Sequence, residues 1–292
     1  MYQDMREGIV DMDSTDYPAL LRFIKNPPKR LYYYGDLSLC QNLCLGIVGA
    51  RKGSAYGKWA AFSIAKKAAE HGVAVVSGMA AGIDSAAHQG ALDAEGKTIA
   101  VLGTGIDVCY PKGNRDLMET IKKRGLLLSE YPPGTPPIAF QFPQRNRIIS
   151  GLSRALVVAE AGLSSGSLIT AECAAEQGRE VFAVPANINS EYGIGTNKLI
   201  QDGATPVVVL DDVLRGLGIT GVCRQNGEFE LLGEDEKKIL KHLAANGELT
   251  ADQLCRLTGA TAAELGAILT ILEMKGWIMT SMGKIYIAKA VF

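Results

Sequence analysis

Three short segments of this chain combine residue types that can bind phosphate. They are Gly49-Ala50-Arg51-Lys52, then Phe142-Pro143-Gln144-Arg145-Asn146-Arg147, then Ser165-Gly166-Ser167-Leu168-Ile169-Thr170. Arginine presents a fork of N–H donors that matches phosphate oxygens, and an aromatic ring can stack on a base. A Ser/Gly turn that opens a helix adds free backbone N–H groups and the positive end of the helix dipole. The combination predicts a phosphate-rich, flexible ligand, and single-stranded nucleic acid fits it.

Each segment also has a structural interpretation without a ligand. The first could be a glycine turn that carries a surface arginine, and Ser or Gly is a common N-cap of any helix. Arg145 and Arg147 are two positions apart, so on a helix they point about 200° apart and only one faces the ligand. The other could form an ion pair with Glu130 or Glu160. The sequence leaves these alternatives open.

Two further titratable residues, Asp84 and His88, are four positions apart and share one helix face. They could form an acid–base pair, yet no nucleophile or second carboxylate is placed to join them. We therefore favour a capping or first-turn role for Asp84 and a structural hydrogen bond for His88. The glycine turn at 49–53 also lacks the Gly-x-Gly-x-x-Gly pattern, and no acidic residue follows Ser77-Gly78 to hold a ribose. An NAD site is not expected.

The composition confines any nucleic-acid binding to a local cluster of cations. Among 292 residues, 47% are hydrophobic and 21% are charged, and the net charge is −1. No apolar run approaches the roughly 20 residues that span a bilayer, and the first residues lack a signal-peptide pattern. We expect a cytoplasmic protein. The six cysteines form no Cys-x-x-Cys and there are three histidines, so we expect no metal site and no cofactor.

Between about residues 45 and 218, short apolar runs alternate with amphipathic stretches. This pattern predicts an α/β fold with a doubly wound, mostly parallel, Rossmann-like sheet of six or seven strands. The runs are Leu45–Val48, Val73–Val76, Thr98–Leu102, Leu126–Leu128, Ala155–Val158, Val181–Val184 and Val207–Leu210. The stretches between them include Lys58–His71, Ser85–Ala94, Asp116–Lys123, Leu168–Gln177 and Lys198–Asp202. Ligands of such sheets bind at the carboxyl ends of the strands, where the candidate segments begin. The loop Gly103 to Pro111 begins there too and could close one side of the cleft.

The flanking segments predict further parts. Residues 1–40 are expected to be an N-terminal arm with a short helix and an extended piece, residues 41–218 the sheet domain, and residues 219–233 a linker. Residues 234–292 predict a small winged helix-turn-helix domain, with helical patterns at 235–245, 251–257 and 262–275 and strands at 277–280 and 285–288. Residues 228–292 carry seven basic and nine acidic residues, and the expected recognition helix has no Lys or Arg. Because phosphate neutralisation dominates duplex binding, a protein contact is favoured for this domain.

Taken together, the segments resemble the DNA-processing protein A family (DprA, also called Smf). The matching motifs are Gly49-Ala-Arg51, Ser77 to His88, Phe142 to Ile149, Ser165 to Ala171 and Gly195 to Ile200, within residues 17–218. The resemblance implies a Rossmann-like core that binds single-stranded DNA without known catalysis. It also implies a homodimer that hands incoming strands to the recombinase RecA during natural transformation. The expected nucleic-acid-binding residues are Gly49, Arg51, Lys52, Phe142, Arg145, Asn146, Arg147, Ser165, Gly166, Ser167 and Thr170.

Three features depart from the family pattern. We expect residues 1–40 to leave room only for the connecting arm of the family's helical N-terminal domain. Ser164 stands where relatives are frequently basic, and Pro185-Ala186-Asn187 replaces a usual Pro-Gly. Two other functions compete with the resemblance. One is a nucleotide-processing enzyme of the phosphoribohydrolase (LOG-like) type, in which Asp84, Glu172 or His88 would be catalytic. The other is a transcriptional regulator that acts through the winged helix, against which the acidic recognition helix argues.

Overall fold

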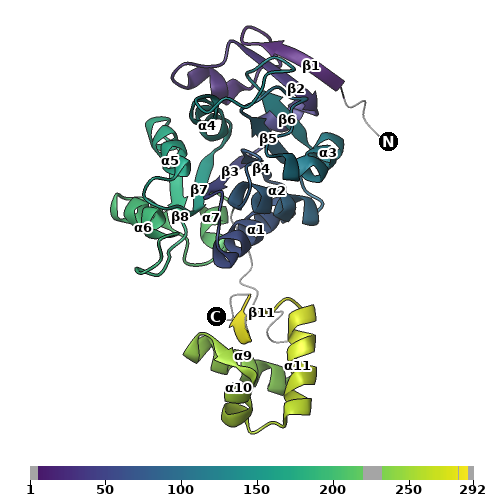
Figure 1. The fold of residues 1–292 in the computed structure, drawn as a ribbon, viewed down its shortest axis with the longest axis vertical. Helices are drawn as coiled ribbons and strands as arrows, with labels where there is room; N and C mark the ends of the chain where they lie inside the picture. Colours follow the sequence, from purple (N-terminus) through teal and green to yellow (C-terminus); the bar gives the residue numbers. More distant parts are fainter. Residues whose placement is uncertain (1–5, 220–231, 282, 289–292) are drawn as a thin grey trace. The chain divides into compact units, whose positions relative to one another are not determined.

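The computed structural model describes residues 6–219, 232–281 and 283–288. The chain divides into two compact units, residues 1–220 and residues 221–292 (Figure 1). In the described part of the first unit, nine strands form one sheet in the order β1-β2-β6-β5-β4-β3-β7-β8-β9. The strands from β6 to β9 in that order pair in parallel, and β1 and β2 are antiparallel. The predicted fold class is confirmed.

The parallel strands form where the sequence has uninterrupted apolar runs. Such runs suit strands that are covered on both faces, and the residues of the central strands are buried throughout. The parallel strands are β3 (Cys44–Gly49), β4 (Ala74–Ser77), β5 (Thr98–Leu102), β6 (Leu126–Ser129), β7 (Ala155–Glu160), β8 (Glu180–Ala183) and β9 (Thr205–Pro206).

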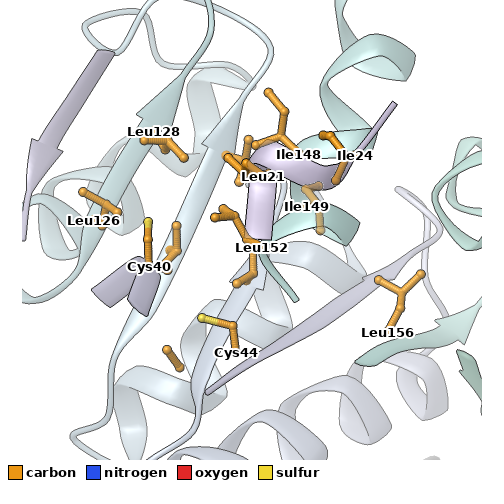
Figure 2. Close-up of a cluster of buried hydrophobic side chains, with 14 of the residues drawn as sticks. Leu21, Ile24, Cys40, Cys44, Leu126, Leu128, Ile148, Ile149, Leu152 and Leu156 are labelled. Carbon is orange, nitrogen blue, oxygen red and sulfur yellow. The ribbon is translucent and has the colours of Figure 1, made fainter. Parts of the chain in front are cut away.

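Helices connect successive parallel strands and cover both faces of the sheet. One face packs against α4 and α5 in a large apolar cluster, part of which Figure 2 shows, and the other packs against α2 and α3. Helix α1 packs along α2. The helices are α1 (Ala55–Glu70), α2 (Ile83–Asp93), α3 (Arg115–Arg124), α4 (Gln141–Leu152), α5 (Gly166–Glu176), α6 (Ile194–Gln201) and α7 (Asp211–Gly216).

The order of the strands creates one natural cleft. From β3 the chain winds outward through β4, β5 and β6, then returns along α4 to β7 on the other side of β3. The loops that follow β3 and β7 therefore leave the sheet in opposite directions. In doubly wound sheets such a switch point, at the carboxyl ends of the strands, is where ligands bind.

Residues 1–40, expected to be an N-terminal arm, are part of the first unit. Strand β2 (Arg30–Gly35) pairs with β6, and β1 (Arg6–Asp11) pairs with β2. Between them the 3-10 helix η1 (Ala19–Phe23) buries Leu21 in the core that contains α4. The segment has too little apolar surface to fold alone, but as two added strands it extends an existing sheet. A second short 3-10 helix, η2 (Leu37–Gln41), then leads into β3.

The last predicted strand of the sheet is misplaced. The apolar run Val207–Leu210 is not a strand, because the amides of Val208 and Val209 donate to the Asp212 carboxylate at 2.7 and 2.8 Å. Asp212 lies in the first turn of α7. Pairing with β8 is therefore confined to Thr205–Pro206 and the adjacent Val207 amide. Residues 220–231 of the predicted linker lie outside the described residues.

The second unit has the order of elements that the sequence predicts for a winged helix. Helices α9 (Glu234–Asn246), α10 (Ala251–Thr258) and α11 (Ala262–Met274) surround an apolar core with Trp277. Strands β10 (Leu249–Thr250), β11 (Ile278–Ser281) and β12 (Lys284–Ile287) form a small sheet in its described part. Among the described residues no single helix is long and apolar enough to cross a membrane; α10 and α11, bent by 111° at their break, pass that test only as a pair.

Candidate functional site

A pocket of about 370 Å³ lies at the switch point between β3 and β7. Its wall is formed by the loops after these two strands, the N-terminal turns of α4 and α5, and residues Ala80 and Asp84 that follow β4. It gathers most of the residues that the sequence singles out: Gly49, Arg51, Phe142, Arg145, Asn146, Ser165, Gly166, Ser167 and Thr170. Segments that are about 100 residues apart in the chain therefore share one cavity.

The Arg145 guanidinium forms the buried cationic part of the pocket. Its Nη1 donates to the carbonyl of Val101 on β5, and its Nε has no hydrogen-bond partner among the described residues. The side chain passes so close to Gly78 that a Cβ at that position would overlap the guanidinium. Burial lowers the pKa of Arg145 to about 10, while the carboxylate of Asp84 acts in the opposite direction. The group stays charged near neutral pH with part of its donor capacity unused.

Asp84 lies in the same pocket and compensates part of this charge. It stands in the first turn of α2, as predicted, and its Oδ2 accepts from the amides of Gly78 and Ala80 at 3.2 and 3.3 Å. Burial raises the pKa of Asp84, and the nearby Arg145 partly offsets this effect. The carboxylate is thus engaged by the loop between β4 and α2, which it shapes around the arginine.

Arg51 supplies the exposed cation of the pocket. It follows β3, and its guanidinium carbon lies 5.4 Å from the centre of the Phe142 ring, within the range of a cation–π contact. Phe142 comes from the first turn of α4 and is half-buried. The ring therefore orients the arginine over the mouth of the pocket.

The N-terminus of α5 forms the opposite wall. Ser165 is the N-cap, and its hydroxyl accepts from the Ser167 amide at 3.4 Å and lies 2.7 Å from the Ser167 hydroxyl. Asn146 donates from Nδ2 to the Gly166 carbonyl at 3.1 Å, which ties α4 to this turn. Gly166 is exposed, and a Cβ there would meet nothing within 4 Å. The first N–H groups of a helix lack intrahelical acceptors, so this wall suits an anion.

The neighbouring N-terminus, that of α1, is already occupied by a carboxylate. Glu160 at the end of β7 accepts from the Ser54 amide at 2.7 Å and from the Ser54 hydroxyl at 2.5 Å. Its side chain also lies against Gly57 in the first turn. Glu160 therefore takes the place that an anion would occupy on α1, and it pairs with neither Arg145 nor Arg147.

Two residues predicted to bind nucleic acid lie outside the pocket. Lys52 is exposed on the loop after β3 and is not part of the lining. Arg147 points to the other side of α4, where its Nη2 donates to both Glu130 oxygens at 2.7 and 2.9 Å. Its Nε also donates to the Asn26 carbonyl at 3.0 Å. Since successive positions on a helix diverge by about 100°, Arg145 and Arg147 could not both enter the pocket.

His88 is a structural residue in this fold. Its ring is buried, and Nδ1 lies 2.7 Å from the Thr98 hydroxyl on β5. Burial lowers the pKa of His88 to about 3. The ring does not line the pocket, and Glu172, the third residue considered for catalysis, lines a different groove between α5 and α6.

Tyr110 and Asp84 contribute to the site although neither is among the predicted binding residues. Tyr110, on the loop after β5, places its ring 5.3 Å from that of Phe142. The sequence signals this residue only by its position after a strand. The sequence predicts a capping or first-turn role for Asp84, and only the fold shows that Asp84 also lines the pocket.

The comparisons with known proteins agree with this architecture. A family model described as DNA recombination-mediator protein A matches residues 8–218, and one described as DprA winged helix domain matches residues 230–284. The chain belongs to the DNA recombination-mediator protein A family. The resemblance found in the sequence is thereby confirmed.

Several DprA and Smf relatives are similar along much of the chain. DNA processing protein DprA of Streptococcus pneumoniae is 48% identical over 200 residues, which are 68% of this chain and 70% of the relative. Protein Smf of Escherichia coli is 37% identical over 283 residues, 94% and 76% of the two chains. Protein Smf of Synechocystis is 42% identical over 240 residues, 81% of this chain, and the match spans 60% of that relative.

Two solved DprA structures superpose on the chain. DprA from Streptococcus pneumoniae gives a TM-score of 0.69 at 44% identity, covering 73% of this chain and 75% of that one. DNA processing protein A from Helicobacter pylori gives a TM-score of 0.66 at 31% identity, covering 74% and 98%. The second of these proteins is described as having a unique single-stranded DNA binding mode.

The ion pair of Arg147 predicts a stability effect. Replacing Arg147 with Met leaves Glu130 partly buried without its partner, and we expect the free energy of unfolding to fall by about 1–3 kcal/mol. Glu130→Gln should cost a similar amount, and the double variant little more than either single one. Urea denaturation of the four proteins measures this cycle. Strictly additive losses would contradict the pairing.

The buried imidazole of His88 predicts a pH effect. Its pKa is about 3 in the folded chain against 6.5 for the free side chain, so below pH 6.5 only the unfolded chain takes up this proton. The contribution of His88 to the free energy of unfolding is complete above pH 6.5. It decreases by about 2 kcal/mol as the pH is lowered from 7.5 to 5. Urea denaturation across this pH range gives the slope of the free energy of unfolding against pH. His88→Asn should remove the part of this slope that His88 contributes. The matched control, His71→Asn at an exposed position, should keep the slope of the parent. Equal slopes in the parent and both variants would refute the role of His88.

Proposed function

We propose that this pocket binds single-stranded DNA, with backbone phosphates held between Arg51 and the N-terminus of α5. The observation that carries the proposal is the buried guanidinium of Arg145, whose Nε has no hydrogen-bond partner among the described residues and which lines the same pocket as the N-terminus of α5. Burying a charge without full pairing is costly, and an anion in the pocket would relieve that cost. The residues proposed to form this site are Gly49, Arg51, Phe142, Arg145, Asn146, Ser165, Gly166, Ser167 and Thr170.

The balance of charge in the pocket supports an anion as the ligand. Two guanidiniums and one helix N-terminus face one carboxylate, and that carboxylate already accepts two backbone N–H groups. Asp84 therefore neutralises only part of the positive charge. The Helicobacter pylori relative is described as a single-stranded DNA binder, which makes a polymeric phosphate the candidate ligand for this chain.

The positions of the acidic residues favour binding over catalysis. A phosphoribohydrolase would need a carboxylate or imidazole free to act on a bound nucleotide. Asp84 is held by backbone amides, while His88 and Glu172 do not line the pocket. The winged helix offers no better duplex site, because α11 (Ala262–Met274) contains no Lys or Arg.

Replacing Arg51 with Ala tests the phosphate contact. We expect binding to a fluorescent single-stranded oligonucleotide to weaken about tenfold at low salt. The slope of log affinity against log salt should become shallower by about 0.7, the contribution of one phosphate contact on a single strand. Anisotropy titrations at several salt concentrations measure both quantities.

Arg154→Ala is the matched control for this titration. Arg154 is exposed and precedes β7 at the amino end of the strand, opposite the pocket, so the same change of charge should leave affinity and slope unaltered. Equal behaviour of the two variants would exclude the pocket as the binding site.

We further propose that the bound strand is passed to the recombinase RecA during DNA uptake, and that the chain acts as a homodimer in the cytoplasm. The family description as a recombination mediator supports a transfer of this kind. A mediator must hold a strand and then release it, and a pocket with one exposed and one buried arginine leaves the phosphate partly accessible.

A RecA assay tests the transfer. On single strands coated with a single-strand-binding protein, the chain should shorten the lag before RecA-dependent ATP hydrolysis, and Arg51→Ala should lose this effect. Light scattering on the same sample gives the oligomeric state. An unchanged lag with a chain that binds the strand would exclude RecA loading.

A further inference from the structure

The Phe142 ring has neighbours on several sides. The Arg51 guanidinium lies over it at 5.4 Å, and the Tyr110 ring lies 5.3 Å away at an interplanar angle of 38°. Behind it, a Cβ at Gly103 would come within 2.8 Å of the ring, so only a glycine leaves room there. A base that stacked on Phe142 would have to displace the arginine that binds its phosphate.

Tyr110 offers the free aromatic surface at this rim. The residue is 41% exposed, while its ring remains in contact with Phe142. The loop that carries it is tightly held: the Thr104 hydroxyl donates to the Val108 carbonyl at 2.9 Å, and the Gly105 amide to the Thr135 carbonyl at 3.0 Å. The Tyr110 ring thus lies on a loop whose backbone is fixed by a hydrogen bond within the loop and by another to the segment between β6 and α4.

We propose that Tyr110 is the surface on which a base of the bound strand stacks, and that Phe142 is a positioning residue for Arg51. This inference rests on the proposed function, because the base belongs to the strand whose phosphate sits in the pocket. It extends the site from β3 and β7 across to the loop after β5. The ligand is then a strand with unpaired bases, since a base inside a duplex exposes no face for stacking.

The charges beside Tyr110 agree with a strand that continues past it. Lys112 and Arg115 are exposed, in the short helix η3 (Lys112–Asn114) and at the start of α3. Arg115 is near enough to Cys109 to favour the thiolate of that residue, although burial is the larger effect and raises the Cys109 pKa. Two exposed cations thus follow Tyr110 within five residues of the chain, and grooves that track a nucleic-acid backbone are lined by such cations.

Two oligonucleotides of equal length and charge separate stacking from phosphate binding. One is oligo(dT), and the other is an abasic strand with the same phosphates. Tyr110→Ala should weaken binding of oligo(dT) about tenfold, the typical loss of one stacked base, and change abasic binding by less than about twofold. Phe142→Ala should weaken both strands to a similar degree, because it acts through the phosphate contact of Arg51.

Further variants keep the test independent of folding. Tyr110→Phe retains a π face and should bind oligo(dT) like the parent, whereas Tyr110→Leu fills the site without one and should bind like Tyr110→Ala. Phe23→Ala, at an 85% exposed ring on η1, controls for loss of any surface aromatic. Full oligo(dT) binding by Tyr110→Ala, or an equal loss on both strands, would overturn the role of Tyr110 alone. A parent chain that binds neither strand would overturn the proposed function and this inference together.

Discussion

Burial of the Arg145 guanidinium beneath the carboxyl edge of the sheet is the interaction on which the candidate site depends. The side chain leaves the second turn of α4, passes Gly78 and donates to the Val101 carbonyl at the end of β5. A buried guanidinium tolerates few arrangements, because each donor left unpaired costs free energy. The contact therefore fixes the N-terminal half of α4 over the sheet. With α4 fixed, Phe142 stands at the rim where Arg51 arrives from β3.

A second constraint distinguishes the two helix N-termini at the switch point. Both α1 and α5 start there, and each has the positive end of its dipole toward the cleft. Glu160 closes the first, through the amide and hydroxyl of Ser54, whereas among the described residues the second is capped by the neutral hydroxyl of Ser165. The Glu160 carboxylate at the end of β7 thus compensates the positive end of the α1 dipole. The loop that follows β7 leaves the N-terminus of α5 open to a ligand. The groups that remain available to an anion therefore extend from Arg51 to the Ser165–Ser167 turn.

The sequence alone predicts the parallel sheet and the edge of that sheet at which the three candidate segments meet. Uninterrupted apolar runs identify buried parallel strands, and loops after such strands meet at one edge of the sheet, so the three candidate segments converge. The misplaced strand at Val207–Leu210 shows the limit of this argument. Apolar content alone does not reveal that a carboxylate just beyond the run, Asp212, takes the amides a strand would need.

The partners of individual side chains could not be predicted in the same way. Which of Arg145 and Arg147 enters the pocket depends on the rotation of α4, which is set by packing of Ile148, Ile149 and Leu152 on the sheet. Figure 2 shows these residues within the cluster of buried hydrophobic side chains. The Ser54–Glu160 contact joins residues 106 positions apart, and no local pattern encodes it. Periodicity gives the faces of an element, whereas pairings across the sheet require the assembled fold.

Binding of a phosphate at the N-terminus of α5 is tested most directly by the amide spectrum of the isotope-labelled chain during titration with oligo(dT). We expect the backbone amide resonances of Gly166 and Ser167, at the open start of α5, to shift in proportion to binding. The Ser54 and Gly57 amides, at the start of α1 closed by Glu160, should move far less. Unchanged α5 amides, with the shifts confined to another surface, would contradict the assignment of the phosphate to this helix.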